Sequence, residues 1–239
     1  MRYGRKTLHA EMYQAILIWE FFGFATEGFF AEVGAYDSKT LSVTWLLERV
    51  GWRGILVEPL PDKSEALRKE RPNSKVYDVA VSSEEKTGEA DFYVKGALSS
   101  LERNIKDDRT VYDSVIRVKV VTLDSLLEES KVPKLDFVSI DTEGTEHDVL
   151  RGFDIKKYEP PLILVEDVVY TLRVHHYLRR MGYRLLRRTG FNNWYVPVHS
   201  REKTPVFEQW KLFRKMYLGT PFRAFKFNRR RRKRAEGGS

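Results

Sequence analysis

The sequence predicts an α/β fold in which a mostly parallel sheet carries helices on both faces. Between residues 29 and 198, short apolar runs alternate with amphipathic segments, and this alternation indicates strands and helices in turn. Acidic residues and glycines follow several of these runs directly, as they do where parallel strands end beside a ligand. Apolar residues make up 42% of the 239 residues, including 14 Phe, 12 Tyr and 5 Trp, which is enough for one well-packed core.

The first elements are read in chain order. A strand is predicted at 29–33, with a turn after it. Apolar residues at helical spacing then predict a helix over 41–50, which Gly51 ends. The next elements are a strand, a helix closed by the following proline, and a strand, at 54–57, 62–71 and 75–79.

The middle of the chain interrupts this alternation. Residues 90–94 and 115–121 both resemble strands, and a polar connection separates them, so we expect an insertion or edge hairpin near the active face. The alternation then resumes with a helix, a strand, a helix and a strand, at 122–129, 135–140, 143–150 and 161–165.

The last elements close the sheet. A helix is predicted at 171–181, followed by an antiparallel pair of strands at 183–187 and 194–198 around a turn at Asn192-Asn193. Residues 204–218 predict a helix with an aromatic face. The predicted organisation is an N-terminal helical segment, the main domain, a C-terminal helix and a disordered basic tail, at 1–26, 27–200, 201–222 and 223–239.

Charge is distributed unevenly along the chain. Residues 223–239 carry seven of the eight net positive charges. Residues 168–201 contain seven Arg and no acid, which predicts a surface that attracts anions or nucleic acid. The arginines assigned to this surface are Arg173, Arg179, Arg180, Arg184, Arg187 and Arg188.

Several classes of protein are excluded by what the sequence lacks. There is no cysteine, which excludes disulfides, thiolate zinc sites, iron–sulfur clusters and a cysteine nucleophile. No 18-residue window is free of charge, so we expect no membrane span, and the N-terminus does not read as a secretory signal. We therefore expect an intracellular, cytoplasmic protein, with the run Arg229–Arg234 as a nuclear targeting signal, as a solvated disordered end, or as a polybasic end that binds anionic membranes.

Three motifs carry candidate chemistry, and the first two, together with Asp78, lie at the ends of the first three predicted strands. Glu32 and Gly34 follow the first strand, where glycine lets the backbone approach a nucleotide-like ligand. Glu58 ends the next strand 24 residues after Gly34, the position at which an acid accepts both ribose hydroxyls. Asp78, 20 residues further on, is placed either to meet an adenine amino group or to cap a turn.

The third motif is DFVSIDTEGTEHDVLRG, from Asp136 to Gly152. An apolar strand that runs into clustered acids is costly, because carboxylates repel one another unless a cation or a proton resolves them. We interpret this cluster as part of a functional site.

The combination FFAEVGAYD, GWRGILVEP and LDFVSIDTEGTEHDVLRG followed by LILVE resembles the FkbM family of methyltransferases. With LSVTWLLE it is similar to the eukaryotic and viral branch of that family, which includes Star-like proteins. The resemblance covers about residues 27–198. It implies a class I S-adenosylmethionine (SAM) dependent methyltransferase fold, with a Rossmann-like sheet of seven strands, the last antiparallel, and an O-methylation activity.

The resemblance also assigns the cofactor-binding residues. It places Glu32, Gly34 and Ala35 on the methionine and sugar side of SAM, Glu58 at the ribose, Asp78 and Ala80 near adenine, and Asp141 at the methionine end. Asp37 and Pro59 complete the predicted set. Two positions depart from the family, which commonly has Gly at Ser38 and Asn at Val43. A SAM-binding scaffold without catalysis is therefore one alternative.

Catalysis needs a group that takes a proton from the acceptor oxygen, because the sulfonium methyl is already activated. Candidate bases are His147, His175, His176 and Lys119. Another route uses Mg²⁺ or Mn²⁺ held by Asp141, Glu166 and Asp167 at two neighbouring strand ends. The alternative role of Glu166 is to orient a substrate or to bond a backbone amide.

The leading hypothesis is a methyltransferase for a hydroxyl of a small molecule or sugar. The second is a methyltransferase for an RNA ribose 2′-hydroxyl, because arginine clusters bind phosphate.

Overall fold

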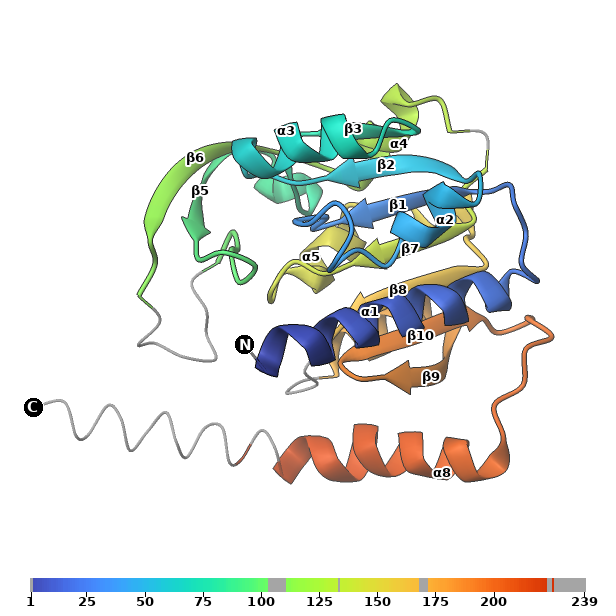
Figure 1. Cartoon of the computed structure of the whole chain (residues 1–239). Coiled ribbons are helices and arrows are strands. Elements are labelled where there is room, and N and C mark those ends of the chain that lie inside the picture. Colours follow the sequence, from blue (N-terminus) through green and yellow to red (C-terminus); the bar gives the residue numbers. More distant parts are fainter. Residues whose placement is uncertain (1, 103–110, 133, 168–171, 223–224, 226–239) are drawn as a thin grey trace, which may run out of the picture.

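The computed structural model describes residues 2–102, 111–132, 134–167, 172–222 and 225 (Figure 1). Its main sheet has seven strands. Their order is β3 (Ser74–Tyr77), β2 (Arg53–Val57), β1 (Phe29–Val33), β7 (Phe137–Ile140), β8 (Leu162–Glu166), β10 (Asn192–Pro197) and β9 (Tyr183–Thr189). The strands from β3 to β8 pair in parallel, and β10 is antiparallel to both of its neighbours. This confirms the predicted seven-stranded, mostly parallel sheet with an antiparallel last strand.

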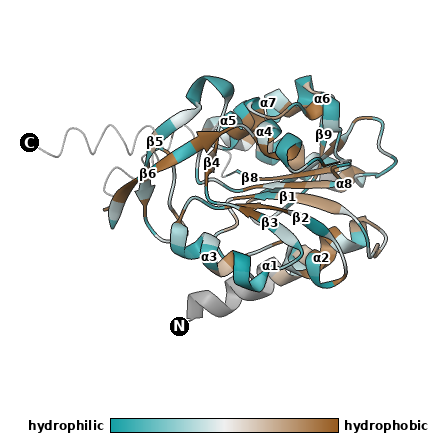
Figure 2. Cartoon of the chain, turned by 90° about the horizontal axis from the view of Figure 1, so that it is seen from above, coloured by the Kyte–Doolittle hydropathy of each residue, from teal (hydrophilic) through white to brown (hydrophobic). Residues whose placement is uncertain are grey.

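Helices cover both faces of this sheet (Figure 2). On one side lie α1 (Arg2–Phe21), α2 (Trp45–Arg49) and α3 (Pro61–Glu70); on the other lie α4 (Leu123–Glu129), α5 (Glu146–Arg151), α6 (Ile155–Tyr158) and α7 (Arg173–Arg180). Alternate strand residues divide between the two cores, since Phe30 and Leu56 pack with the first group and Ala31 and Ile55 with the second. Strands buried on both faces are therefore continuously apolar, which is why the sequence predicted them closely.

A second, three-stranded sheet stands at the carboxyl ends of the main strands. It has the order β4 (Ala80–Val81), β6 (Ser114–Val121), β5 (Gly88–Val94), with β5 and β6 antiparallel and the 3-10 turn η1 (Glu84–Lys86) before them. Its small core contains Leu60, Phe92 and Val118. The expected hairpin insertion is thus present, and it stands beside the edge where a ligand would bind.

Two predicted elements differ from the structure. The helix expected over 41–50 begins only at Trp45, because Ser42 and Thr44 direct their side chains to Glu32. The turn expected at Asn192-Asn193 lies at residues 190–191 instead. Asn193 is inside β10, where its side chain accepts from Arg188, so a residue type common in turns is used here within a sheet.

The C-terminal helix is α8 (Val206–Phe213), which continues through a π-helical turn, η2 (Arg214–Leu218), to residue 222. Apart from Phe225, the predicted tail of 223–239 with Arg229–Arg234 lies outside the described residues. Within the described part of the chain, no helix combines the length and apolarity needed to cross a membrane.

Candidate active site

A pocket with about 700 Å³ of empty space opens at the carboxyl ends of β1, β2 and β7. The loops after these strands form its floor, and residues of β5 and of the loop 96–101 form the opposite wall. The lining residues are Val33, Gly34, Tyr36, Leu41, Val57, Glu58, Pro59, Val79, Ala80, Val81, Phe92, Gly96, Ala97, Ser99, Leu101, Asp141, Thr142, Glu143 and Thr145. The sequence-predicted Gly34, Glu58, Pro59, Ala80 and Asp141 are therefore brought together.

A glycine is needed at position 34, because the backbone after β7 passes directly against it. Its φ is +87°, a left-handed conformation that favours glycine, and a Cβ there would lie 1.8 Å from the carbonyl oxygen of Asp141. The chain after β1 thus passes against the chain after β7. This contact fixes the floor of the pocket.

Glu58 is a buried carboxylate held by the backbone. Its Oε1 accepts the N–H of Leu60 at 2.8 Å, and its Oε2 accepts the N–H of Tyr36 at 3.0 Å. Burial raises the pKa of Glu58 to about 7, and these two backbone hydrogen bonds oppose that rise. Each carboxylate oxygen keeps further acceptor capacity, so the group is oriented and ready for two donors from a ligand.

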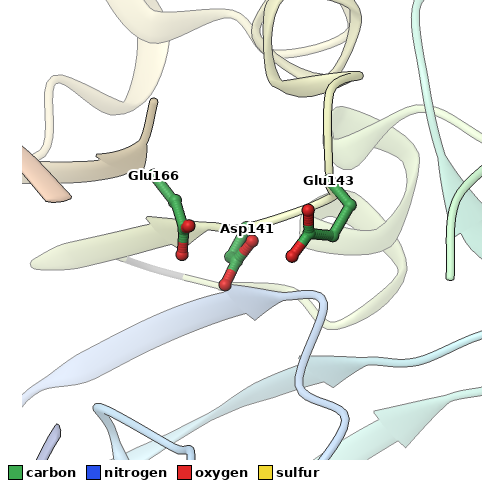
Figure 3. A group of neighbouring side chains, drawn as sticks. All are labelled: Asp141, Glu143 and Glu166. Carbon is green, nitrogen blue, oxygen red and sulfur yellow. The ribbon is translucent and has the colours of Figure 1, made fainter. Parts of the chain in front are cut away.

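Three carboxylates meet beside the ends of β7 and β8, and two of them, Asp141 and Glu143, line the pocket (Figure 3). One ligand oxygen from each of Asp141, Glu143 and Glu166 lies within 4.8 Å of the others. Burial and the neighbouring Glu166 raise the pKa of Asp141 well above its usual range. Oδ1 of Asp141 is buried and has no hydrogen-bond partner within the described structure. This end of the pocket therefore favours a bound proton or cation.

The loop that carries Glu143 is held in a strained shape. Glu143 has a φ of +55°, and Glu146 accepts the backbone N–H of Gly144 at 2.7 Å and of Thr142 at 3.3 Å. The hydroxyl of Ser100 donates to the carbonyl of Thr142 at 3.0 Å and ties the opposite wall to this loop. The carboxylate cluster is thus fixed from both sides.

Glu32 lies outside the pocket, which corrects its predicted contact with the cofactor. Its buried carboxylate accepts from the hydroxyls of Ser42, at 2.9 Å, and Thr44, at 2.5 Å. Arg71 lies 4.0 Å away, and burial raises the pKa of Glu32 despite this cation. Glu32 therefore supports the loop after β1 from beneath.

Three other predicted cofactor residues are also corrected. Ala35 is buried in the core that contains Leu47, on the far side of the loop. The carboxylate of Asp37 accepts backbone N–H groups from residues 39, 40 and 41 and so shapes the turn. Asp78 forms an exposed ion pair with Arg68 at 3.0 Å, in agreement with the alternative turn role.

The metal ligand set also changes. Glu143 takes the third place that was predicted for Asp167, whose backbone carbonyl accepts from Arg188 and whose N–H donates to Phe191. Sequence reasoning assigned Glu143 to the acidic cluster without selecting it. Glu143 and the glycine after it, Gly144, both have positive φ, so the Glu-Gly pair is the sequence feature that could have singled out Glu143.

The candidate bases lie apart from the carboxylates. His147 and His176 line a separate basic pocket, and burial together with Arg173 lowers the pKa of His147. His175 is buried, with Nε2 2.9 Å from the hydroxyl of Tyr217, and burial lowers its pKa to about 4. Lys119 is exposed on β6. Asp141, which lines the pocket and adjoins Glu166, is thus the candidate proton acceptor at this end of the pocket.

The basic pocket lies between α5 and α7, and its lining residues are His147, Arg173, His176, Arg179 and Arg180. The six arginines that were predicted to share one surface lie in two groups. Those of α7 line the basic pocket, whereas those of β9 contact other residues of the protein. Arg187 stacks over Trp194 at 4.7 Å, Arg184 donates to backbone carbonyls of 200 and 202, and Arg188 donates to Asn193. The α7 arginines are the ones that face a cavity.

The wall residues Tyr36, Phe92, Ser99 and Leu101 were not predicted as site residues. They come from the insertion and from the loop after β1. Only the expectation that the insertion lies near the active face pointed toward them.

The sequence of this chain matches one protein family. A family model described as "Methyltransferase FkbM domain" matches residues 32–185. Two solved structures are similar. The N-terminal domain of human METTL16, in complex with SAH, has a TM-score of 0.43 and 13% identity, covering 78% of this chain and 68% of that one. Precorrin-6y C5,15-methyltransferase from Geobacter metallireducens has a TM-score of 0.38 and 10% identity, covering 72% and 80%. No curated protein sequence matches the chain significantly.

Proposed function

The chain belongs to the methyltransferase FkbM domain family, and we propose that it transfers the methyl group of SAM to a hydroxyl oxygen of a small molecule or sugar. The observation that supports this proposal most directly is that the two ends of one pocket carry different carboxylate groups. At one end Glu58 is oriented by two backbone N–H groups, and at the other lies Asp141, whose pKa is raised by burial and by the neighbouring Glu166.

The lining fits SAM. Glu58 would accept the ribose hydroxyls, Gly34 would let the backbone approach the ligand, and the apolar side chains of Val57, Val79 and Phe92 would surround the adenine. The unpartnered Oδ1 of Asp141 would accept from the amino group of the methionine end. Bound there, SAM supplies a methyl group already activated on a sulfonium sulfur.

The carboxylates of Asp141 and Glu166 then take up the proton of the acceptor hydroxyl. As the hydroxyl oxygen forms its bond to the methyl carbon and the carbon–sulfur bond breaks, the hydroxyl proton passes to the carboxylate pair. In the alternative route, Asp141, Glu143 and Glu166 would instead hold Mg²⁺ or Mn²⁺, whose charge would lower the pKa of the acceptor hydroxyl.

The first experiment is calorimetry with SAM and S-adenosylhomocysteine, followed by methylation assays with hydroxyl acceptors before and after EDTA. We expect binding of both ligands, with Glu58→Ala weakening it. Equal SAM affinity in wild type and variant would reject the assigned pocket. Binding without transfer to any acceptor would favour the non-catalytic scaffold. Full activity after chelation would remove the cation from the proposal while leaving the carboxylate base.

A second candidate is methylation of an RNA ribose 2′-hydroxyl. The observation that favours it is the basic pocket beside α5, where Arg173, Arg179 and Arg180 face one cavity. His147 of this pocket follows Glu143 of the carboxylate cluster by four positions in the sequence. The guanidinium groups of the basic pocket would hold a phosphate of the RNA substrate.

A further inference from the structure

The C-terminal helix presents a row of large apolar side chains to solvent. From Val206 to Phe222 these side chains are between 47% and 82% exposed. They are Val206, Phe207, Trp210, Phe213, Leu218 and Phe222, and Phe225 continues the row. Scattered exposed apolar residues are ordinary, but a contiguous set on one helix marks an interaction surface. We call these seven residues the aromatic face.

The π-helical turn η2 keeps this face continuous. Phe207, Trp210 and Phe213 are three residues apart, as one side of an α-helix requires. The next member, Leu218, follows after five residues, and this longer step coincides with η2, where the chain uses an extra residue in the turn. Phe222 then follows after four. Without the π turn, the two halves of the face would point in different directions.

The opposite side of the helix is attached to the protein. Met216 and Thr220 are 1% and 6% exposed. The hydroxyl of Tyr217 accepts from Arg179 at 3.0 Å and lies 2.9 Å from Nε2 of His175, both on α7. The helix is therefore held with the aromatic face outward, and Trp210 and Phe213 stack on each other with centroids 5.9 Å apart.

The same segment is strongly basic. Residues 209–235 contain eleven Lys and Arg and no Asp or Glu. Lys211, Arg214 and Lys215 are exposed on the helix itself, at the border of the aromatic face. Exposed aromatic rings bordered by cations on one helix are typical of segments that lie in the interface of a membrane, with rings among the lipid chains and cations at the headgroups.

We propose that the aromatic face, with Lys211, Arg214 and Lys215 at its border, binds the surface of a bilayer that contains anionic lipids, with the helix parallel to that surface. A second copy of the chain is a poorer occupant, because pairing two such faces would bring two acid-free basic segments together. The helix runs beside β9, and its last turns lie toward the side where the parallel strands end (Figure 1).

The test is flotation of the full chain with vesicles of phosphatidylcholine alone, or with about one third phosphatidylserine, at about 0.1 M salt. We expect flotation with the anionic vesicles only. Trp210→Ser with Phe213→Ser should weaken the apparent affinity by about tenfold or more, because two rings lose their burial in lipid. Phe191→Ser is the matched control, since Phe191 is 59% exposed on the turn before β10 and should be neutral.

Removal of residues 223–239 should weaken binding and reduce its dependence on salt, while brominated lipids should still quench Trp210 in the truncated protein. Failure of the full chain to float with anionic vesicles would overturn the proposal. Equal flotation of the double Ser variant and wild type would also overturn it, because charge alone would then account for binding. A dimer in light scattering that the double variant dissociates would assign the face to a second copy instead.

Discussion

The Nε of Arg71 donates to Oε2 of Glu48 at 2.6 Å, inside the protein and beneath the loop that follows β1. The same guanidinium donates to the hydroxyls of Ser42 and Thr44 and lies 4.0 Å from Glu32. One cation thus serves two buried carboxylates. Removing it would leave both without their charge partner, in a place where water cannot replace it.

We therefore expect Arg71→Met to lower the free energy of unfolding by about 3–5 kcal/mol. Urea denaturation measures this loss. The control is Arg68→Met, which breaks the exposed pair with Asp78 and should cost no more than about 1 kcal/mol. Similar losses in the two variants would show that the buried network contributes no more than a surface ion pair.

SAM binding should depend on pH through Glu58. Burial raises the pKa of this carboxyl to about 7, and ribose hydroxyls donate to its ionised form, so binding must release the proton. Affinity should rise by about tenfold between pH 6 and pH 8 and then level off. Calorimetry in buffers of different ionisation enthalpy would detect the released proton. Glu58→Gln should weaken binding by about 1–3 kcal/mol and remove the part of the pH dependence that belongs to this group.

The sequence predicted best what depends on local pattern. The strands β1, β2, β7 and β8 are buried on both faces, so each is predominantly apolar, although Glu32 stands within β1 and Ser139 within β7. The positions of Gly34 and Glu58 in the pocket could be predicted from these strands, because the ends of neighbouring parallel strands meet at one edge of the sheet.

What the sequence did not predict depends on distant partners. Glu32 lies inside β1 opposite Leu56, whereas Glu58 follows the end of β2, and the carboxylate of Glu32 meets Ser42, Thr44 and Arg71 rather than the pocket. The pocket wall that contains Phe92 could not be predicted for the same reason, because its position depends on where the insertion packs against the main sheet. Only tertiary packing decides which of two similar acids is structural.

Asp141 should limit stability at neutral pH. A carboxyl whose pKa is raised in the folded protein retains a proton that the unfolded chain releases, so its contribution to stability falls as pH rises above the unfolded value. Asp141→Asn should therefore stabilise the protein by about 1–2 kcal/mol at pH 8, with little effect at pH 4. Methyl transfer should fall by about a hundredfold or more. Thermal unfolding at both pH values and a transfer assay check this, and a destabilised variant at pH 8 would contradict it.

Gly34→Ala separates backbone strain from steric conflict. Gly34 and Gly182 have φ values of +87° and +86°, but only at Gly34 would a Cβ meet another atom, the carbonyl oxygen of Asp141 at 1.8 Å. Gly182→Ala should cost about 1–2 kcal/mol, the usual strain of a left-handed alanine. Gly34→Ala should cost clearly more and also weaken SAM binding. Equal losses of stability would mean that the loops after β1 and β7 separate easily.

The α7 arginines should bind RNA phosphate if the second candidate function holds. In a chain ending at Phe222, which lacks the basic tail, Arg173→Gln with Arg180→Gln removes two cations that face the basic pocket. RNA affinity at about 50 mM salt should fall by about tenfold, and the slope of log affinity against log salt should decrease by about 1–2, since two phosphate contacts are lost. Arg184→Gln with Arg187→Gln removes the same charge from residues that contact carbonyls and Trp194, and it should change the salt slope less. Fluorescence anisotropy with a short single-stranded RNA measures both variants. If the truncated wild type does not bind RNA at this salt concentration, the basic pocket has no role in nucleic-acid recognition and the small-molecule acceptor is left as the substrate class.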